Sequence, residues 1–479
     1  MVKMNEFELK RSRIGLVDQN LLYWAKIFRR GKIMKPRWGT VAIATAAIWV
    51  CTGPAYAQPS AAQVDVRRAS DATAERPWGD ATLLAEAFEG VPETGPASFR
   101  IVGIEATDTE NRPGRVDERE RILHDGAELS FENRATVQTP PKLRPGWMLA
   151  HYIDVGQGNA TLLEFSCGLA LVDTGGQVTD RFDGTKRLAD YLESVFKRRP
   201  DLDRTVGSIF LSHPHADHTS GVTALLAMSP SLKIGSIVAN ARTNGSGWSH
   251  QKKLISFGRT RSIPVSLITN EAIRRSDGLT DAAIDTLRCG DADPDIRVLW
   301  GSDSSAHHWT SEANNHSVVI RVDFGESSFL FTGDLEETAQ PEFIGSYVRN
   351  PDIVDADIYQ VSHHGSRNGT TEALLRVMTP EIAVIGSGNP ADEEPGFSAY
   401  NFGHPNRVAI NLLSDPAFGV SLTRPEVTVP VGISGRRPGG NTPPRYALQP
   451  VRSAIFSTGW DGDIVIAASI QGAKKVLVQ

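Results

Sequence analysis

The most informative feature of the sequence is a cluster of three histidines and one aspartate. His213, His215, Asp217 and His218 lie within six residues of one another and directly follow an apolar segment, Ser208 to Leu211, that is predicted to be a strand. Four nitrogen and oxygen donors on one turn cannot all point into a core, because a buried unpaired group of this kind costs several kcal/mol. Imidazole and carboxylate are ligands of Zn²⁺, with Mn²⁺ or Fe as alternatives. The cluster predicts a metal site; a solvated histidine-rich turn is the alternative.

The spacing within this cluster divides its members between two positions. His213 and His215 are two residues apart on extended chain and face the same way, whereas Asp217 and His218 are turned toward a neighbouring position. Two-metal sites hold ions about 3.5–4 Å apart, lower the pKa of a bridging water and polarise the scissile group. In such a site Asp217, bound through one oxygen, would hold or accept the proton of the attacking water. No serine or cysteine nucleophile is then required.

Short strands and amphipathic helices are expected to position these residues. Residues 148–155, 161–165 and 169–172 lie too close together for helices to separate them, which predicts an antiparallel meander. Apolar residues then recur with helical spacing from Leu188 to Phe196, as on a helix packed against a sheet. Further strands are predicted at 236–239, 265–268, 296–300, 317–323, 328–331, 358–361 and 382–385, and helices at 219–228, 335–347 and 371–377. The chain therefore reads as an α/β protein with strands of mixed direction.

The first 57 residues differ in charge from the rest of the chain. They contain ten basic and three acidic residues, a net charge of +7, while the remaining 40 basic and 53 acidic residues give −13. A basic start at Lys32 precedes 14 mostly apolar residues, 38–51, fewer than the ~20 that a spanning helix needs. Ala55-Tyr56-Ala57 offers small residues for cleavage. We expect residues 1–57 to be a signal segment, with Met34 as a possible true start, cleaved after Ala57; a single membrane anchor is the alternative.

Cleavage there would leave a periplasmic or secreted protein with no stable membrane span. Residues 58–146 form a polar N-terminal extension with a strand expected at 98–104 and no evident chemistry, and residues 147–479 carry all of the motifs. Cys167 and Cys289 would remain after cleavage. They lie far apart in sequence without a CxxC or Cys/His spacing, so we expect burial as small hydrophobic side chains rather than metal binding; pairing in an oxidising compartment is the alternative.

The motifs resemble the metallo-β-lactamase fold superfamily, whose signature is HxHxDH after a strand. The chain is more closely similar to the hydrolase domain of ComEC-type competence proteins, over about residues 147 to 470. Seven motifs carry this resemblance in order: Ile153-Asp154-Val155-Gly156-Gln157-Gly158, Leu171-Val172-Asp173-Thr174-Gly175, Leu211-Ser212-His213-Pro214-His215-Ala216-Asp217-His218, Asn314-Asn315-His316-Ser317, Phe331-Thr332-Gly333-Asp334, Val361-Ser362-His363-His364-Gly365-Ser366 and Gly403-His404-Pro405.

The resemblance implies a four-layer αββα sandwich, in which two sheets pack face to face, helices lie outside and metals bind at one sheet edge. It also implies two zinc ions held by the cluster and by Asp334, which would bridge them. One residue of the pair His363 and His364 would complete the second metal position, and both remain candidates. The metal ligands implied in this way are His213, His215, Asp217, His218, Asp334, and His363 or His364.

Three further residues have two interpretations each. Asp173 would orient the metal ligands from behind, or it caps a turn before Gly175. His404 would join Asp217 as a catalytic group that contacts an oxyanion or leaving group, and Ser366 would contact the substrate there as well. The alternatives are a histidine at a helix start for His404 and a turn cap for Ser366.

Two positions depart from the family pattern. Many members place a histidine before the strand predicted at 317–323, where this chain has Asn314 and Asn315; His316 is a substitute with an unusual offset. This departure implies a weakly held first metal. Asn159 stands where the family ordinarily has an aspartate after Gly-Gln-Gly. A neutral amide cannot act as an anionic ligand or base, so activity would be retuned or lost.

The function implied by the resemblance is hydrolysis of a phosphodiester, in a small molecule or a nucleic acid. A lactam or ester hydrolase of the same fold and a non-catalytic, metal-retaining binding protein are the alternatives. The charge of −13 gives a polyanion no general attraction. Basic residues that would form a local groove occur after the cluster, although a solvated helix face explains them equally: Arg242, Lys252, Lys253, Arg259 and Arg261. Residues 424–445, rich in Gly, Pro and Arg, are expected to be a flexible surface loop.

Overall fold

A computed structural model describes residues 100–102, 104–106, 143–273, 277–304, 311–393, 396–436 and 442–479. The predicted signal segment and most of the predicted extension lie outside these residues. All described residues fall within one unit, residues 76–479. Within this described part, no helix has both the length and the apolar character needed to cross a membrane.

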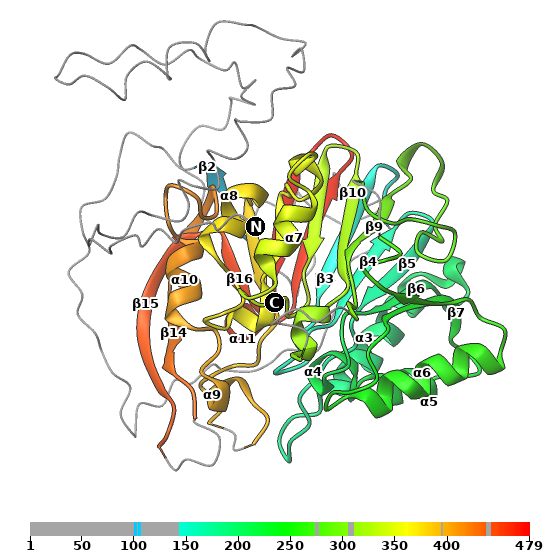
Figure 1. Ribbon diagram of the computed structural model, residues 1–479, viewed down its shortest axis with the longest axis horizontal. Helices are drawn as coiled ribbons and strands as arrows, with labels where there is room; N and C mark the ends of the chain where they lie inside the picture. Colours follow the sequence, from blue (N-terminus) through cyan, green and yellow to red (C-terminus); the bar gives the residue numbers. More distant parts are fainter. Residues whose placement is uncertain are drawn as a thin grey trace, which may run out of the picture. The chain divides into compact units, whose positions relative to one another are not determined.

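The larger of the two main sheets has nine strands in the order β1-β18-β17-β3-β4-β5-β6-β7-β8 (Figure 1). The predicted meander is confirmed, since β3, β4 and β5 pair antiparallel, and β5 to β8 then run parallel. The strands are β1 (Arg100–Val102), β3 (Trp147–Tyr152), β4 (Thr161–Phe165), β5 (Gly168–Val172), β6 (Thr205–Leu211), β7 (Lys233–Asn240), β8 (Val265–Ile268), β17 (Ile464–Ser469) and β18 (Lys474–Val478).

The second main sheet has six strands in the order β16-β13-β12-β11-β10-β9. β9, β10 and β11 pair antiparallel, whereas β11, β12, β13 and β16 are parallel. The mixed strand direction predicted from the sequence is therefore present in both sheets. The strands are β9 (Asp295–Trp300), β10 (Val319–Phe324), β11 (Ser327–Phe331), β12 (Ile358–Gln360), β13 (Ile382–Ile385) and β16 (Ile455–Ser457).

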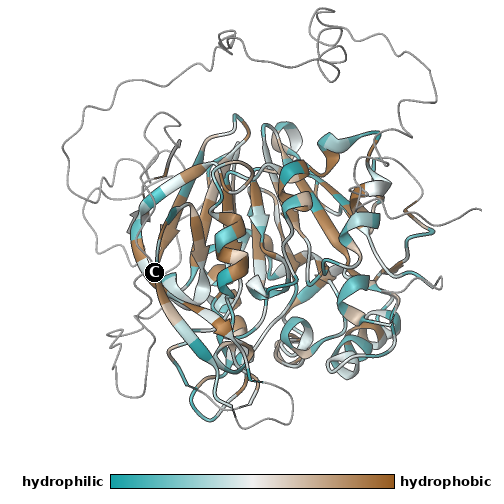
Figure 2. Cartoon of the chain, turned by 60° about the vertical axis from the view of Figure 1, so that its left-hand side comes forward, coloured by the Kyte–Doolittle hydropathy of each residue, from teal (hydrophilic) through white to brown (hydrophobic). Residues whose placement is uncertain are grey.

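The two sheets pack face to face because successive side chains on a strand point to opposite faces. On β6, Phe210 joins the apolar core that also holds Ile320 and Phe331 of the second sheet. Its neighbours Ile209 and Leu211 join a separate core under the outer helices. A strand that is buried on both faces reads as a continuous apolar run, as the end of β6 from Ile209 to Leu211 does. Figure 2 shows hydrophobic residues concentrated on these central strands.

Helices cover the outer faces and complete the four-layer αββα fold predicted from the motifs. Leu188, Tyr191 and Leu192 of α3 pack on the first sheet, and Phe343 and Leu374 of α7 and α8 pack on the second. The helices are α3 (Gly184–Arg198), α4 (Ala216–Thr219), α5 (Val222–Ala227), α6 (Trp248–Thr260), α7 (Gln340–Ser346), α8 (Glu372–Met378), α9 (Ala399–Phe402), α10 (Arg407–Leu413) and α11 (Thr458–Asp461). Short 3-10 turns are η1 (Pro200–Leu202), η2 (Gly290–Ala292), η3 (Ala313–His316), η4 (Pro351–Ile353) and η5 (Ser362–Gly365).

Part of the segment expected to be a flexible loop is regular structure instead. β14 (Leu422–Ser434) and β15 (Arg445–Ser453) form a long antiparallel hairpin, with β2 (Glu105–Ala106) on its other edge. Arg424 is buried, forms an ion pair with Asp461 at 2.7 Å, and lies 4.1 Å over the ring of Phe456. The expectation of a loop was wrong for residues 424–434, because these tertiary partners stabilise a strand that the Gly, Pro and Arg content disfavours locally.

The described residues of the N-terminal extension contribute edge strands to two sheets. β1 lies within the strand predicted at 98–104 and pairs antiparallel with β18, and β2 pairs with β14. Val102 is buried and belongs to the same core as the central strands. Pairing and burial therefore connect residues 100–106 to the sheets of the domain that follows.

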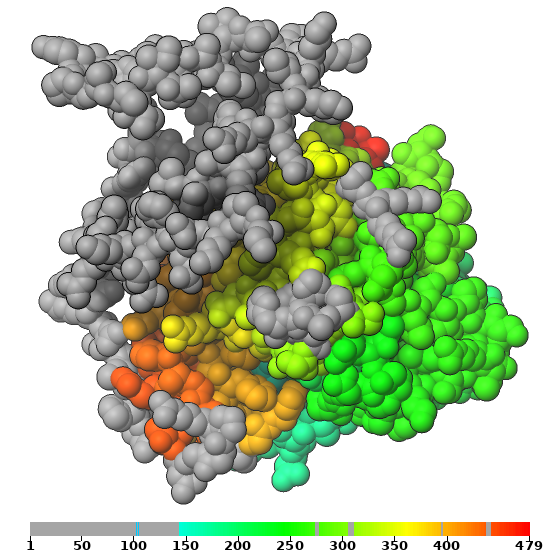
Figure 3. All heavy atoms as spheres, in the orientation of Figure 1, coloured from blue at the N-terminus to red at the C-terminus, as the bar shows by residue number. Residues whose placement is uncertain are grey.

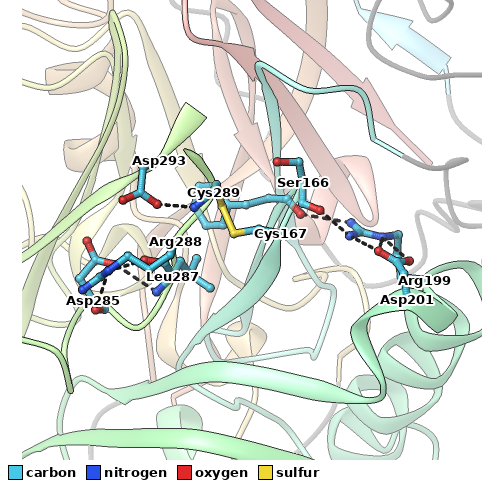
Figure 4. Close-up of a disulfide and its surroundings, with 10 residues drawn as sticks. Ser166, Cys167, Arg199, Asp201, Asp285, Leu287, Arg288, Cys289 and Asp293 are labelled. Carbon is cyan, nitrogen blue, oxygen red and sulfur yellow. Dashed lines mark hydrogen bonds and ion pairs between the residues drawn. A yellow bond between two sulfur atoms is a disulfide. The ribbon is translucent and has the colours of Figure 1, made fainter. Parts of the chain in front are cut away.

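Cys167 and Cys289 form a disulfide, which corrects the expectation that they would be separate buried thiols. Cys167 lies in the β4–β5 turn and Cys289 immediately precedes η2, and folding brings their Cα atoms to 5.1 Å although they are 122 residues apart (Figure 4). On the far side of the turn, the guanidinium of Arg199 donates to the carbonyl of Ser166 at 2.9 Å. The pairing follows from the packing of the sheets and has no signature in local spacing.

This disulfide gives a first prediction, for the double variant Cys167→Ser/Cys289→Ser. Because the bond closes a loop of 122 residues, its loss should lower the free energy of unfolding by about 2–5 kcal/mol. Urea denaturation with and without dithiothreitol measures the effect. Reductant should lower the midpoint of the wild type and leave that of the variant unchanged. Equal midpoints for the wild type in both conditions would show that the bond does not form or does not stabilise the fold.

Candidate metal centre

The predicted site residues follow strands that end at one edge of the two sheets. β5 and β6 are parallel neighbours in the first sheet, and β11, β12 and β13 are parallel neighbours in the second. Parallel strands present their carboxyl ends at the same edge, where the following loops meet. Asp173 follows β5, the motif from His213 to His218 follows β6, Asp334 follows β11, and His363 and His364 follow β12.

A helix start turns the histidine cluster in two directions. His215 is still extended, with φ −93° and ψ 157°, and α4 begins at the next residue, so Asp217 and His218 occupy the first helical turn. The helix expected at 219–228 therefore begins earlier and is divided into α4 and α5. This local change from strand to helix is what separates His213 and His215 from Asp217 and His218.

Four groups converge on one point. The ligand atoms of Asp217, His218, Asp334 and His364 all lie within 4.8 Å of one another, and all four residues are buried. The Nε2 of His218 lies 3.1 Å from Oδ1 of Asp334, and the Nε2 of His364 lies 3.2 Å from Oδ2 of Asp217. The two Nε2 atoms are 3.2 Å apart. Of the pair left open by the sequence, the structure places His364 in this group.

Hydrogen bonds behind the two imidazoles aim their Nε2 atoms at this point. The Nδ1 of His364 lies 2.7 Å from the carbonyl of Gly386, to which it donates. The Nδ1 of His218 lies 2.7 Å from Oδ2 of Asp173. A neutral imidazole that donates through Nδ1 has a free lone pair on Nε2, which is the form that binds a metal.

Asp173 faces His218 and Ser212 rather than the turn before Gly175. Its Oδ1 accepts from the backbone N–H of Ser212 at 2.7 Å, and its Oδ2 accepts from the hydroxyl of Ser212 at 2.8 Å as well as facing His218. The carboxylate therefore caps the start of the motif and also orients His218. Ser212, which the sequence analysis did not single out, also lies 3.1 Å from Nδ1 of His213 through its hydroxyl.

A second group of donors lies next to the first and shares Asp334 with it. The Nε2 of His213 is 3.1 Å from Nδ1 of His215 and 3.7 Å from Oδ2 of Asp334. The Nε2 of His363 is 3.9 Å from the same Oδ2. Asp334 thus presents one oxygen toward His218 and the other toward His213. His215 and His363 are the more exposed members of the set.

The residues Asn314 to His316 hold a neighbouring loop. Asn314 donates through Nδ2 to Glu336 at 2.8 Å, and the Oδ1 of Asn315 accepts from the backbone N–H of Glu336 at 3.1 Å. His316 is buried and accepts through Nδ1 from the backbone N–H of Asp303 at 3.0 Å. The four converging groups do not include His316. This segment therefore fixes the loop that begins at Asp334.

His404 lies beside the cluster, and Ser366 stabilises a turn. The ring of His404 is 5.9 Å from that of His363 and 6.1 Å from that of His364, and its Nδ1 is 3.4 Å from Nε2 of Gln157. Gln157 belongs to the motif Ile153 to Gly158, whose spacing predicted no role for this side chain. The hydroxyl of Ser366 donates to Oδ1 of Asn368 at 2.8 Å, as expected for the turn-cap interpretation.

Asn159 supports the cluster through its backbone. Its N–H donates to the carbonyl of Asp217 at 3.0 Å, and its carbonyl accepts from Gly175 at 2.7 Å. The side chain is buried, and neither Oδ1 nor Nδ2 has a hydrogen-bond partner in the described part of the chain. Its Oδ1 closely approaches Gly386, the residue whose carbonyl holds His364.

The two buried carboxylates of the cluster need compensating positive charge. Burial would raise the pKa of Asp217, but the hydrogen bond from His364 and the charge of His218 hold it below its usual range. Burial is likewise outweighed at Asp334, where His218 and His364 hold the pKa well below its usual value. In turn, burial would lower the pKa of both histidines, but Asp334 raises it. Two ionised carboxylates therefore attract protons onto the histidines, and a metal ion replaces those protons when it binds.

The donor set fits a metal of the zinc type. Oδ1 of Asp334 is buried and accepts no hydrogen bond within the described residues, although it faces His218. Two imidazole nitrogens and two carboxylate oxygens around one point form the mixed N and O set that Zn²⁺ accepts in tetrahedral geometry. His213, His215 and the second oxygen of Asp334 offer the same chemistry at the adjacent position.

Comparison with known proteins gives the family. Residues 153–388 match the family described as the metallo-beta-lactamase superfamily. These residues form a metallo-β-lactamase domain. Recombination protein 2 of Haemophilus influenzae is 27% identical over 246 residues, and ComE operon protein 3 of Bacillus subtilis is 25% identical over 300 residues. The resemblance to ComEC-type competence proteins that the ordered motifs indicated is confirmed.

These alignments cover half or slightly more of this chain and a smaller part of each relative. They span 51% of the chain and 25% of Recombination protein 2, and 58% of the chain and 32% of ComE operon protein 3. The chain thus spans about a quarter to a third of the length of these curated relatives. Among solved structures, the metallo-beta-lactamase fold protein YhfI of Bacillus subtilis is 14% identical, with a TM-score of 0.28, over 50% of this chain and 85% of that one.

The hydrogen bonds behind the metallo-β-lactamase site give a second prediction, for Asp173→Asn. An amide is neutral and has only one accepting oxygen, so it cannot accept from Ser212 and from Nδ1 of His218 as the carboxylate does, and the imidazole loses orientation and basicity. We expect the affinity for Zn²⁺ to fall about 10–100-fold, measured by competition with a chromogenic chelator. His364→Gln should lose zinc from the same position.

His316→Gln is the matched control, because this buried histidine binds the backbone at Asp303 and not the cluster. It should retain the zinc content and affinity of the wild type when circular dichroism shows that both are folded. Loss of zinc from this variant to the same extent as from His364→Gln would contradict the assignment.

Proposed function

We propose that this protein is an exported, binuclear metal-dependent hydrolase that acts on phosphodiester bonds. The observation that carries the proposal is the convergence of Asp217, His218, Asp334 and His364, with His213 beside them on the second oxygen of Asp334. Among the relatives, one is named for recombination and another for competence. Recombination acts on nucleic acids, which are phosphodiester polymers, and this favours a phosphodiester over a lactam or a carboxylic ester.

Two zinc ions, when bound, would lower the pKa of a bridging water and polarise the scissile group. The chain's own residues would position the other participants. Asp334 would link the two metal positions, because one of its oxygens faces His218 and the other faces His213. Asp217 would keep one oxygen available to accept a proton from the nucleophile. Its other oxygen is held by His364 at 3.2 Å.

His404 would contact the departing or developing oxyanion. Burial lowers the pKa of His404 well below its usual value, and the neighbouring His363 and His364 lower it further. The ring is therefore neutral at pH 7 and serves as a hydrogen-bonding group rather than a fixed cation. Gln157, 3.4 Å from its Nδ1, would set the orientation of the ring.

A non-catalytic, metal-retaining protein is the second candidate, and Asn159 is the observation that favours it. Its amide replaces a carboxylate of the family pattern and is buried without a hydrogen-bond partner in the described part of the chain. Its backbone nevertheless holds Asp217, and its side chain approaches Gly386 behind His364. Asn159 therefore affects the position of Asp217 and His364 and is not itself one of the proposed ligands. For this reason hydrolysis remains our first proposal.

The proposed export is supported by the cysteines. A disulfide between Cys167 and Cys289 is typical of proteins in oxidising compartments, because thiols in the cytosol are kept reduced. A basic and then apolar segment followed by Ala55-Tyr56-Ala57 precedes the domain in the sequence. We therefore propose a periplasmic or secreted protein.

Hydrolysis gives the third prediction. Purified protein with added Zn²⁺ or Mn²⁺ should hydrolyse bis-p-nitrophenyl phosphate in preference to a chromogenic cephalosporin. Asp217→Ala should lower kcat/KM at least about 100-fold, as loss of a general base does. Asp334→Ala should abolish both metal binding and turnover. His250→Gln, on the surface helix α6, is the control. Turnover that survives both aspartate substitutions would exclude the metal mechanism, and metal binding without turnover on any of these substrates would favour the second candidate.

Export gives the fourth prediction. When the full chain is expressed in a Gram-negative host, N-terminal sequencing of the protein in the periplasmic fraction should begin at Gln58. Ala57→Leu should block processing, because a large side chain replaces the small residue required before the cleavage site. Full-length protein that is retained in the membrane would contradict this prediction and support an anchor.

A further inference from the structure

One long stretch of the chain carries positive charge without any negative charge. From His218 to Asn270 there are six lysines and arginines and no aspartate or glutamate, whereas the chain as a whole has a net charge of −6. This stretch begins at a residue of the metal cluster and includes α5, β7, α6 and β8. An acid-free segment of this length is unexpected in a chain with more acidic than basic residues.

The helix α6 displays this charge on its solvent face. Its buried side is formed by Gln251, Leu254, Ile255 and Gly258. Lys252, Lys253 and Arg259 are exposed, at positions that share the opposite side of the helix, and Arg261 is exposed just beyond its end. Figure 1 shows α6 beside α5 among the helices at the lower right, and the green region that contains it forms the right-hand side of the surface in Figure 3.

These exposed cations are not paired, unlike many others on the surface. Lys186, Lys233 and Arg376 each form an ion pair with a nearby carboxylate. Within the described residues, Lys252, Lys253, Arg259 and Arg261 form none, although Arg261 stacks on the ring of Phe257. The helix dipole favours cations in the last turn, which explains Arg259 but not Lys252 and Lys253.

The loop that precedes α6 connects this face to the metal centre. The N–H of Gly247 donates to the carbonyl of Pro214 at 2.8 Å, and the N–H of Ala216 donates to the hydroxyl of Ser246 at 3.1 Å. Gly245 packs so closely that a Cβ there would lie 3.2 Å from the ring of His215. α6 therefore begins beside the half-buried His215, and its 13 residues extend about 20 Å away from it.

We propose that the exposed face of α6 is a track that binds the phosphate backbone of a nucleic-acid strand and leads it to the metal centre. This inference rests on the proposed phosphodiester hydrolysis and extends it from a small diester to a polymer. Contacts remote from the reacting phosphate supply binding energy that a small substrate cannot use. Lysine and arginine contacts to phosphates supply this energy regardless of base sequence. The track consists of Lys252, Lys253 and Arg259, with Arg261 at its far end.

The test is the triple variant Lys252→Glu/Lys253→Glu/Arg259→Glu. Its affinity for a fluorescein-labelled oligothymidylate, measured by anisotropy with zinc bound, should fall at least about tenfold. The slope of the logarithm of the association constant against the logarithm of the salt concentration should become shallower by about 2. Three phosphate contacts are lost, and each contact to a single strand contributes ~0.7. The ratio of oligonucleotide turnover to bis-p-nitrophenyl phosphate turnover should fall together with the affinity.

The control is Lys197→Glu/Arg349→Glu/Arg445→Glu, which makes the same change in net charge at exposed positions outside the track. It should bind and cleave as the wild type does. Wild-type affinity and salt slope in the α6 variant, equal losses in the control, or no binding by the wild type would each overturn the inference. A wild type that binds the oligonucleotide through α6 but hydrolyses neither substrate would support the track and reject the proposed catalysis. Zinc content and circular dichroism verify that both variants are folded.

Discussion

The structure depends on the burial of charged side chains at a junction of two sheets. Asp217 and Asp334 are buried beside His218 and His364, and ionised carboxylates are stable in such a place only when every oxygen is hydrogen-bonded, paired or bound to a metal. The two aspartates come from different sheets, one after β6 and the other after β11. The relative position of the sheets is therefore fixed by the geometry of the site as well as by the apolar core between them. Asp173 completes the arrangement by satisfying His218 from behind.

The backbone near the ligands adopts conformations that side chains ordinarily avoid. Asp173 has a φ of 57°, and His363 and His364 have φ values of 53° and 54°, in the left-handed region that favours glycine. Such positions cost about 1–3 kcal/mol each and persist where the surroundings hold them. Asp173 is held through Ser212 and His218, and His364 through the carbonyl of Gly386. The stable sheets thus support a locally strained loop that presents two consecutive histidines in different directions.

The sequence predicted the parts of this arrangement that arise from local pattern. The apolar runs predicted the meander and most of the later strands, and the spacing of His213 to His218 indicated two ligand directions. The arrangement in two sheets was implied by the family resemblance. The choice between His363 and His364 depends on backbone dihedral angles and on Gly386, which no spacing encodes. The disulfide was missed for the same reason, because its cysteines meet only after the sheets have packed. The hairpin around Arg424 was missed because a buried ion pair with Asp461 outweighs the local composition.

The charge of the chain shows why a sum over residues is a weak guide to a binding surface. A net charge of −13 after removal of the predicted signal segment argued against a polyanionic substrate. At physiological ionic strength the Debye length is about 8 Å, so a ligand phosphate responds mainly to the side chains within that distance and little to the remainder of a large protein. On α6 and just beyond it the exposed charged side chains are the cations Lys252, Lys253, Arg259 and Arg261, and the sequence from His218 to Asn270 contains no carboxylate. Local segregation of charge, in a chain that is acidic elsewhere, would direct an anionic polymer to the proposed track without promoting adsorption over the rest of the surface.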